Sequence, residues 1–242
     1  MARAPLALSP ALPSELLTYI LSQSSQPITL IICQPRAAFL SSLRDSVTTQ
    51  EDPPDHENGN GIESPAEHHP LLVPTLRQIA TARHVKVVFI PTVSHLRAYL
   101  SVFPKEERDY DSGQLGEAKK KTPLPLLVVY GLVEMHRDTS EWSAQGLGNS
   151  VAGLVEAGWR GALEIVVVER KGDGEGGLDL EDGLEMGDAR KVWGQRMPML
   201  NGSVRRVGMG SEDAGWSGRT VEVGRVLGRW FRFRKGSWEG EV

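Results

Sequence analysis

The clearest candidate for chemistry in this sequence is residues 126–132, which read LLVVYGL. Such an apolar run predicts a buried strand, and in a Walker B strand the position after it carries the Asp that holds Mg²⁺. Here that position is Tyr130, and a phenol does not replace a carboxylate as a hard oxygen ligand. Glu134 and Asp138 follow and could take over, although an acid at a helix start more often interacts with the helix dipole. The run therefore predicts the strand of a magnesium site without its acid.

The phosphate-binding half of such a site is also missing from the sequence. The loop G-x-x-x-x-G-K-[ST] needs glycines so that backbone N–H groups can surround the phosphates, and a lysine for the β and γ oxygens. No Gly-Lys dipeptide occurs in the 242 residues. We also expect no strand and no glycine loop ahead of the first helix, which begins near Pro13. Residues 172–177 are glycine-rich but contain two acids that would repel phosphate, so they predict a flexible loop. We therefore expect no nucleotide cofactor and no ATPase activity.

The other reactive side chains give little indication of a catalytic or metal site. Cys33 is the one cysteine and lies in an apolar run, so a core position and a reducing compartment are expected. His56, His68 and His69 lie among acids and could bind a transition metal weakly, but no cysteine pair supports a zinc site. His136 is single, and a surface or satisfied polar role is expected. No catalytic group, resident metal or cofactor is predicted.

The C-terminal tail is the main positive feature, because arginines alternate there with aromatic residues. In an extended strand, Arg232 and Arg234 would share one face and Phe231 and Phe233 the other. A basic row can follow a phosphate backbone, and an exposed Trp230 can stack on a base. We predict a nucleic-acid site formed by Arg225, Arg229, Trp230, Arg232, Arg234 and Lys235. The open alternative is a solvated edge strand, whose cations discourage strand-to-strand aggregation.

Alternating strands and helices must position these residues. Apolar runs at 28–33, 85–90, 124–130 and 162–169 predict buried strands. Helical patterns follow at 13–21, 36–47, 75–83, 92–103 and 138–159. This alternation predicts an α/β fold with helices on both faces of a mainly parallel sheet. Strand-like pieces at 192–200, 203–209 and 220–234 predict antiparallel strands at the C-terminal end, which would make the sheet mixed.

Length and composition predict one domain spanning residues 1–242, with disordered insertions near 50–70, 104–123 and 171–188. The formal net charge is −4, so any basic surface must be local. No run approaches the roughly 18 apolar residues of a membrane helix, so we expect no membrane contact. A nuclear or cytoplasmic protein is therefore expected.

The order of these segments resembles the RecA-type core of recombinase paralogues. The resemblance covers roughly residues 28–235 and is carried by ITLIIC-QPRAAFLSSL, VKVVFI-PTVSHLRAYLSVF, LPLLVVYGLVE and ALEIVVVE, followed by the basic tail. The sequence is most similar to small, divergent paralogues that act as Shu-complex subunits or as partners of SWIM-domain proteins. It departs from the ATPase pattern at both Walker positions.

This resemblance implies a RecA-like fold and a nuclear, non-catalytic subunit in homologous recombination and DNA repair. Such a subunit would pair with another RecA-like or SWIM-domain protein and contact single-stranded DNA. Elongator accessory subunits share the RecA-like core without ATPase motifs, so a role in tRNA modification is the alternative. An enzyme with a degenerate nucleotide pocket is a third hypothesis.

Overall fold

The computed structural model describes residues 4–23, 26–48, 69–103, 124–171, 191–200, 219–236 and 238. Several expectations therefore lie outside the described residues. These are the insertion at 104–123, nearly all of those near 50–70 and 171–188, the strand piece at 203–209, the glycine run at 172–177, and His56 and His68.

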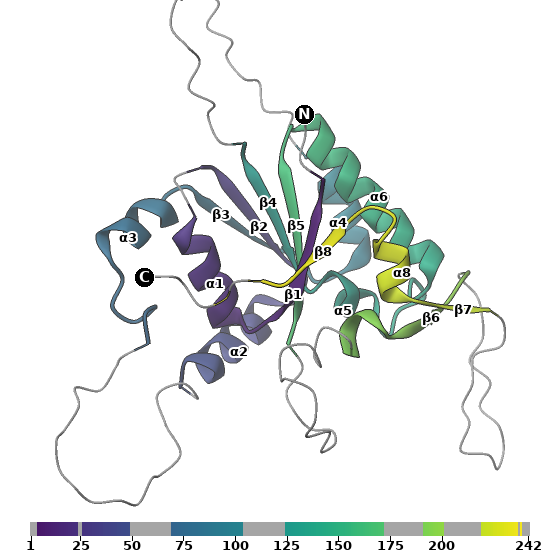
Figure 1. Cartoon of the computed structure of the whole chain (residues 1–242), viewed down its shortest axis with the longest axis horizontal. Helices are drawn as coiled ribbons and strands as arrows, with labels where there is room; N and C mark the ends of the chain where they lie inside the picture. Colours follow the sequence, from purple (N-terminus) through teal and green to yellow (C-terminus); the bar gives the residue numbers. More distant parts are fainter. Residues whose placement is uncertain are drawn as a thin grey trace, which may run out of the picture.

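A six-stranded parallel sheet forms the centre of the fold (Figure 1). Its strand order is β3-β2-β4-β5-β1-β8, and every neighbouring pair is parallel. The strands are β1 (Leu6–Ala11), β2 (Ile28–Ile32), β3 (Val85–Phe89), β4 (Leu126–Tyr130), β5 (Glu164–Arg170) and β8 (Arg232–Arg234). The predicted α/β fold with a mainly parallel sheet is confirmed, but the described antiparallel strands do not join this sheet, so it is not mixed.

Helices cover both faces of this sheet, as expected. They are α1 (Pro13–Ser22), α2 (Arg36–Thr48), α3 (Leu76–Ala82), α4 (Val93–Ser101), α5 (Leu132–His136), α6 (Ala144–Arg160) and α8 (Val223–Leu227). Alternate strand side chains enter two separate apolar clusters: Leu30 and Val128 join the cluster on the α1 and α2 side, whereas Ile31 and Val129 join the one on the α4, α6 and α8 side. Burial on both faces explains why these strands read as continuous apolar runs.

The expectation that no strand precedes the first helix is wrong. β1 lies between β5 and β8, and its backbone register with β5 shifts between Leu8 and Ala11. This irregularity accommodates Pro10, which has no N–H to donate to a neighbouring strand. The glycine loop is nevertheless absent from this position, since Leu12 alone separates the end of β1 from the start of α1.

The C-terminal region agrees with the prediction in part. β6 (Arg196–Pro198) and β7 (Thr220–Glu222) form a separate antiparallel pair, which confirms the antiparallel C-terminal strands. The expectation of extended strand through residues 220–234 is wrong in its middle, where Val223, Val226 and Leu227 are the buried residues of α8. Strand β8 also differs from the expectation, because it runs parallel to β1.

The long helix expected at 138–159 is two helices, α5 and α6. Between them, Asp138 has a left-handed backbone with φ of 59°, which interrupts any continuous helix. Ser143 then caps α6 by accepting a hydrogen bond from the Gly146 N–H at 2.9 Å. A Cβ at Gly146 would collide with the Glu141 carbonyl, so this glycine is explained by close packing inside the chain.

Candidate functional site

At the carboxyl edge of the sheet, two pairs of neighbouring strands lead into helices that lie on opposite faces of the sheet. Each such pair defines a crevice between its two strand ends. β1 leads into α1 on one face, whereas the chain after β5 reaches α8 on the other. β2 and β4 diverge in the same way, into α2 and into α5 and α6. In open α/β sheets, ligands bind at such points. The crevice between β5 and β1 and the crevice between β2 and β4 are therefore the candidate sites.

The first crevice is filled by the protein itself. Tyr130 ends β4 with its side chain fully buried, and its hydroxyl donates to the Ala11 carbonyl at 2.9 Å. The backbone N–H of Lys171 donates to the same carbonyl at 3.1 Å. Ala11 ends β1, which is where a phosphate loop would begin. Tyr130, which the sequence compares with the acid position of a Walker B strand, thus links the ends of β4 and β1.

An acid of the chain also occupies the N-terminus of α1. Glu15 accepts a hydrogen bond from the Leu12 N–H at 2.7 Å, and Pro13 at the first helical position has no N–H to offer. Free N–H groups and the helix dipole make a helix N-terminus a binding site for anions. Here the Glu15 carboxylate takes that position and would repel a phosphate.

A second internal acid serves the N-terminus of α5. Glu169, near the end of β5, accepts a hydrogen bond from the Val133 N–H at 2.9 Å and a longer one from the Glu134 N–H at 3.5 Å. Gly131 precedes this helix with φ of +78°, a conformation that favours glycine. Burial raises the pKa of Glu169 from 4.5 to about 8, although the two N–H groups act in the opposite direction. This carboxyl group is therefore held mainly protonated at neutral pH.

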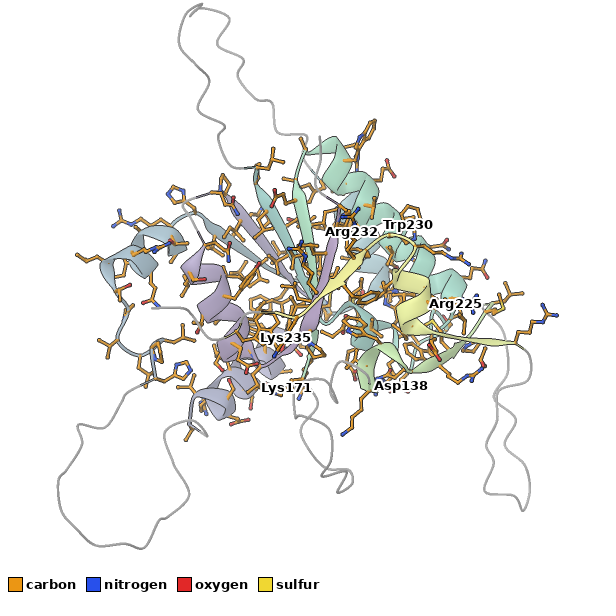
Figure 2. The ribbon with its side chains drawn as sticks, viewed as in Figure 1. Asp138, Lys171, Arg225, Trp230, Arg232 and Lys235 are labelled. Atoms are coloured by element: carbon orange, nitrogen blue, oxygen red, sulfur yellow. The ribbon has the colours of Figure 1, made fainter. Side chains whose placement is uncertain are left out.

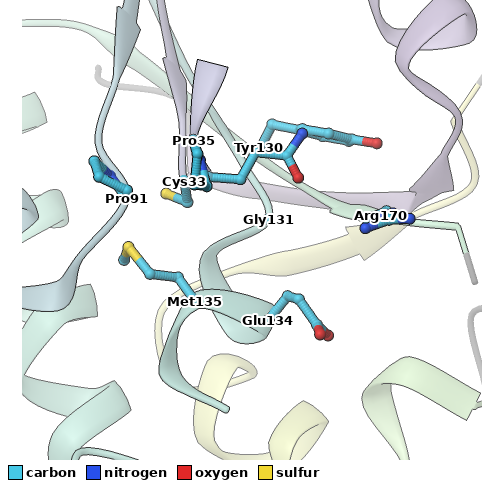
Figure 3. Close-up of a pocket in the computed structure, with 9 residues that line it drawn as sticks. Cys33, Pro35, Pro91, Tyr130, Gly131, Glu134, Met135 and Arg170 are labelled. Carbon is cyan, nitrogen blue, oxygen red and sulfur yellow. The ribbon is translucent and has the colours of Figure 1, made fainter. Parts of the chain in front are cut away.

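The second crevice, between β2 and β4, holds a small pocket of about 190 Å³ (Figure 3). Ligand pockets typically enclose about 300–1,000 Å³. Cys33 and Glu134 line it, and the hydroxyl of Tyr130 points away from Cys33. Burial, followed by the charge of Glu169, raises the pKa of Cys33 well above its ordinary value, so the group is a thiol and not a nucleophilic thiolate.

The two acids considered as replacements for the magnesium ligand are not brought together. Glu134 lines the pocket but forms an ion pair with Arg137 at 3.0 Å, and Asp138 follows α5 outside the pocket lining. Among the residues that the structure describes, no group of three His, Cys, Asp or Glu side chains could hold a metal ion.

Of the two roles expected of it, His136 has the satisfied polar one. Its Nδ1 lies 2.8 Å from the Leu132 carbonyl and must donate, so its Nε2 accepts from the Ser150 hydroxyl at 2.9 Å. Arg97 donates to the same hydroxyl at 3.1 Å and pairs with Glu141 at 2.6 Å. Burial lowers the pKa of His136, which favours this neutral form. The network joins α4, α5 and α6.

His69 is the one residue of the group His56, His68 and His69 that the structure describes. It is buried and accepts a hydrogen bond from the Leu71 N–H at 3.2 Å.

The six residues of the predicted nucleic-acid site are all exposed, and the Trp230 side chain is 41% exposed. Arg232 and Arg234 share one sheet face, because they pair in register with Leu6 and Leu8 of β1. Phe233 lies on the other face, where its ring contacts Trp193 with ring centroids 5.4 Å apart. The predicted alternation of basic and apolar side chains is confirmed.

These six residues do not form one compact cluster. Figure 2 shows Trp230 and Arg232 together at the start of β8, Lys235 past its end, and Arg225 apart on α8. Arg232, Arg234 and Lys235 therefore follow the edge of the sheet as a row, whereas Arg225 lies apart from it. Because β8 is an edge strand, the alternative role of preventing strand-to-strand aggregation fits the same placement.

A search of protein-family models and of curated proteins finds no match to this chain. None of the described helices combines the length and the apolar character needed to cross a membrane.

Sequence reasoning missed Glu15 and Glu169. A capping box is usually read from Ser or Thr three residues before Glu, and here that position is Leu12. The signal for Glu169 was a single acid that ends the apolar run IVVVE, which on its own does not reveal the helix that it caps.

Proposed function

We propose that this protein is a non-catalytic subunit of the RecA-like type that assists homologous recombination in the nucleus through protein–protein and single-stranded DNA contacts. The observation that carries the proposal is the filled crevice between β5 and β1. There the Tyr130 hydroxyl bonds to the Ala11 carbonyl, and Glu15 occupies the N-terminus of the following helix. A nucleotide would have to displace both groups.

The strand order adds support. In chain order the six strands are arranged 3-2-4-5-1-6, which differs from the common dinucleotide-binding order 3-2-1-4-5-6 and from the flavodoxin order 2-1-3-4-5. The strand order therefore argues against a nicotinamide or flavin enzyme of either kind.

The DNA contact is proposed for the edge formed by β8. Arg232 and Arg234 face solvent on one side of this strand, with Arg229 and the half-exposed Trp230 just before it. Cations in such a row can contact successive phosphates, and the indole can stack on an unpaired base.

The test is binding of fluorescent single-stranded DNA at several salt concentrations. The triple variant Arg229→Gln, Arg232→Gln and Arg234→Gln should bind more weakly, and the slope of log K against log salt should fall by about 2, or about 0.7 for each lost phosphate contact. A matched variant with Arg36→Gln, Arg44→Gln and Arg83→Gln removes the same charge from exposed positions elsewhere. Equal behaviour of the two variants would refute a DNA site at β8.

The non-catalytic assignment has its own test. Micromolar, Mg²⁺-dependent ATP binding by the full chain would refute it and favour the enzyme hypothesis. The filled crevice supports an Elongator-type accessory subunit as well, and partners decide between the two. Purification from native cells should recover a SWIM-domain protein or a recombinase; recovery of Elongator subunits would favour the tRNA role.

A further inference from the structure

Helix α3 turns its apolar residues outward. Arg77 donates to the Ser22 carbonyl at the end of α1 at 3.1 Å, and Thr81 is a buried residue of the helix. Leu76 and Ile79, by contrast, are 86% and 43% exposed. An amphipathic surface helix normally buries its apolar stripe and exposes its polar face. The arrangement of α3 is the reverse, so its outer face is suited to contact with something apolar.

The exposed apolar surface extends beyond this helix. Of the twelve exposed large apolar side chains among the described residues, five lie within residues 72–87. They are Leu72, Val73, Leu76, Ile79 and Val87, and we call them the α3 patch. Val87 lies on the edge strand β3, and its register partner Leu30 belongs to the apolar cluster on the α1 side. Figure 1 shows α3 beside α1 at this end of the sheet. Gathered apolar side chains of this kind mark interaction surfaces.

Basic residues border the α3 patch. Residues 69–103 contain four Lys or Arg residues and no Asp or Glu. Arg97 is paired with Glu141, but Arg77 within α3 and Arg83 at its end are exposed. A partner that covers the patch must place groups beside these two cations. Acidic side chains are the complementary choice, because electrostatic complementarity across an interface selects the correct partner.

We propose that the α3 patch is a docking site for an acidic, apolar segment of another protein. Leucine-type side chains of that segment would cover Leu76 and Ile79, and its Asp or Glu residues would pair with Arg77 and Arg83. The inference does not depend on the role proposed in recombination. That role is tested at β8, on the opposite edge of the sheet.

Two other occupants fit the surface less well. A second copy of this chain in a two-fold dimer would bring the same surface from both sides, so Arg77 and Arg83 would face like charges. An anionic membrane would gain little from two cations and from a helix as short as Leu76–Ala82. A partner of opposite charge has neither disadvantage.

The test is selection from a random peptide library displayed on phage, with the full-length protein as bait. The double variant Leu76→Glu, Ile79→Glu serves as the bait for counter-selection, and both positions are exposed enough for the fold to persist. Enriched peptides should combine Leu, Ile or Phe with an excess of Asp and Glu. As synthetic peptides, they should bind the wild type at least about tenfold more tightly than the double variant.

Two further variants separate charge from general damage. Arg83→Glu should weaken binding of the same peptides and favour versions in which Lys replaces their acids. Val102→Glu changes a side chain that is 75% exposed beyond the end of α4, and it should bind as the wild type does. The charge variant tests the proposal even if the double variant does not fold.

Several results would overturn the proposal. One is that no peptide is enriched on the wild type relative to the double variant. A second is that the enriched peptides carry no excess of Asp and Glu. A third is that Arg83→Glu does not change the preference for acidic peptides over their Lys versions. Sedimentation of the protein alone and flotation with vesicles of phosphatidylcholine and phosphatidylserine test the other occupants. A dimer or a vesicle-bound state that the double variant abolishes would assign the patch to a second copy or to a membrane.

Discussion

Replacing Glu169 by Gln should remove a large part of the pH dependence of stability. The carboxyl group is buried, and its pKa rises from 4.5 in the unfolded chain to about 8 in the folded protein. Between these values the folded state keeps a proton that the unfolded chain has lost. Stability from this group is therefore fully present below pH 4.5 and is lost as the pH rises towards 8.

The expected size follows from proton linkage. Within this window each pH unit costs about 1.4 kcal/mol, because the unfolded chain binds one proton fewer. Between about pH 6 and about pH 8, the free energy of unfolding should fall by roughly 2 kcal/mol, since the folded group itself begins to ionise near the upper limit. The amide introduced by Glu169→Gln is neutral at every pH, and its carbonyl can still accept from the Val133 N–H that now lies 2.9 Å from Glu169.

Urea unfolding of both proteins at these two pH values, followed by tryptophan fluorescence, measures the difference. His136 also titrates, with a lowered pKa and so with stability lost as the pH falls, but this contribution is shared and cancels. Glu156→Gln is the matched control, because the Glu156 side chain is 68% exposed and should leave the wild-type profile unchanged. If the variant and the wild type lose stability equally with rising pH, the carboxyl group is not held protonated. If the free energy of unfolding of the wild type instead rises relative to that of the variant as the pH rises, the two N–H groups lower the pKa of Glu169 by more than burial raises it.

The remaining predictions concern the same edge of the sheet and the left-handed residues. Tyr130→Phe should lower the free energy of unfolding by about 1 kcal/mol, because one buried hydrogen bond is lost while the Ala11 carbonyl keeps its bond from Lys171; an unchanged midpoint in urea would mean that the phenol does not fasten β1 to β4. Gly131→Ala should destabilise by about 1 kcal/mol and Ala162→Gly should stabilise by up to about 1 kcal/mol, since these positions have φ of 78° and 49°. Thermal unfolding measures both, and shifts in the same direction would contradict the strain argument.

The central strands could be predicted because burial on both faces leaves an unambiguous sequence. β2 and β4 read ITLII and LLVVY, and nearly all of their side chains are buried. β1 reads LALSPA, and its Ser and Pro resemble loop residues. Its pairing with β5, with a register shift, and with β8 makes a strand of it. Around α8, Val221 of β7 and Val223 and Val226 of the helix mix alternation with helical spacing, and tertiary packing decides between the two.

The state of the candidate site could be predicted only in part. The sequence run at 126–130 was enough to predict a buried strand that ends in Tyr130. What fills the crevice depends on contacts between distant segments: the Tyr130 hydroxyl and the Ala11 carbonyl are 119 residues apart, and Glu169 and Val133 are 36 residues apart. Local propensity carries no information on such pairs, so Glu15 and Glu169 were not among the predicted residues.

These internal contacts change what the missing motifs mean. A site that had merely lost a lysine would keep open helix N-termini that attract anions. Here Glu15 and Glu169 accept hydrogen bonds from N–H groups at the starts of α1 and α5, and Tyr130 fastens the strand ends between them. Nucleotide binding at this edge would require displacing groups that satisfy backbone donors and acceptors, each at a cost of about 1–3 kcal/mol. This cost supports the proposal that the protein acts through its two sheet edges, with cations at β8 and an apolar surface at α3, rather than through the carboxyl edge.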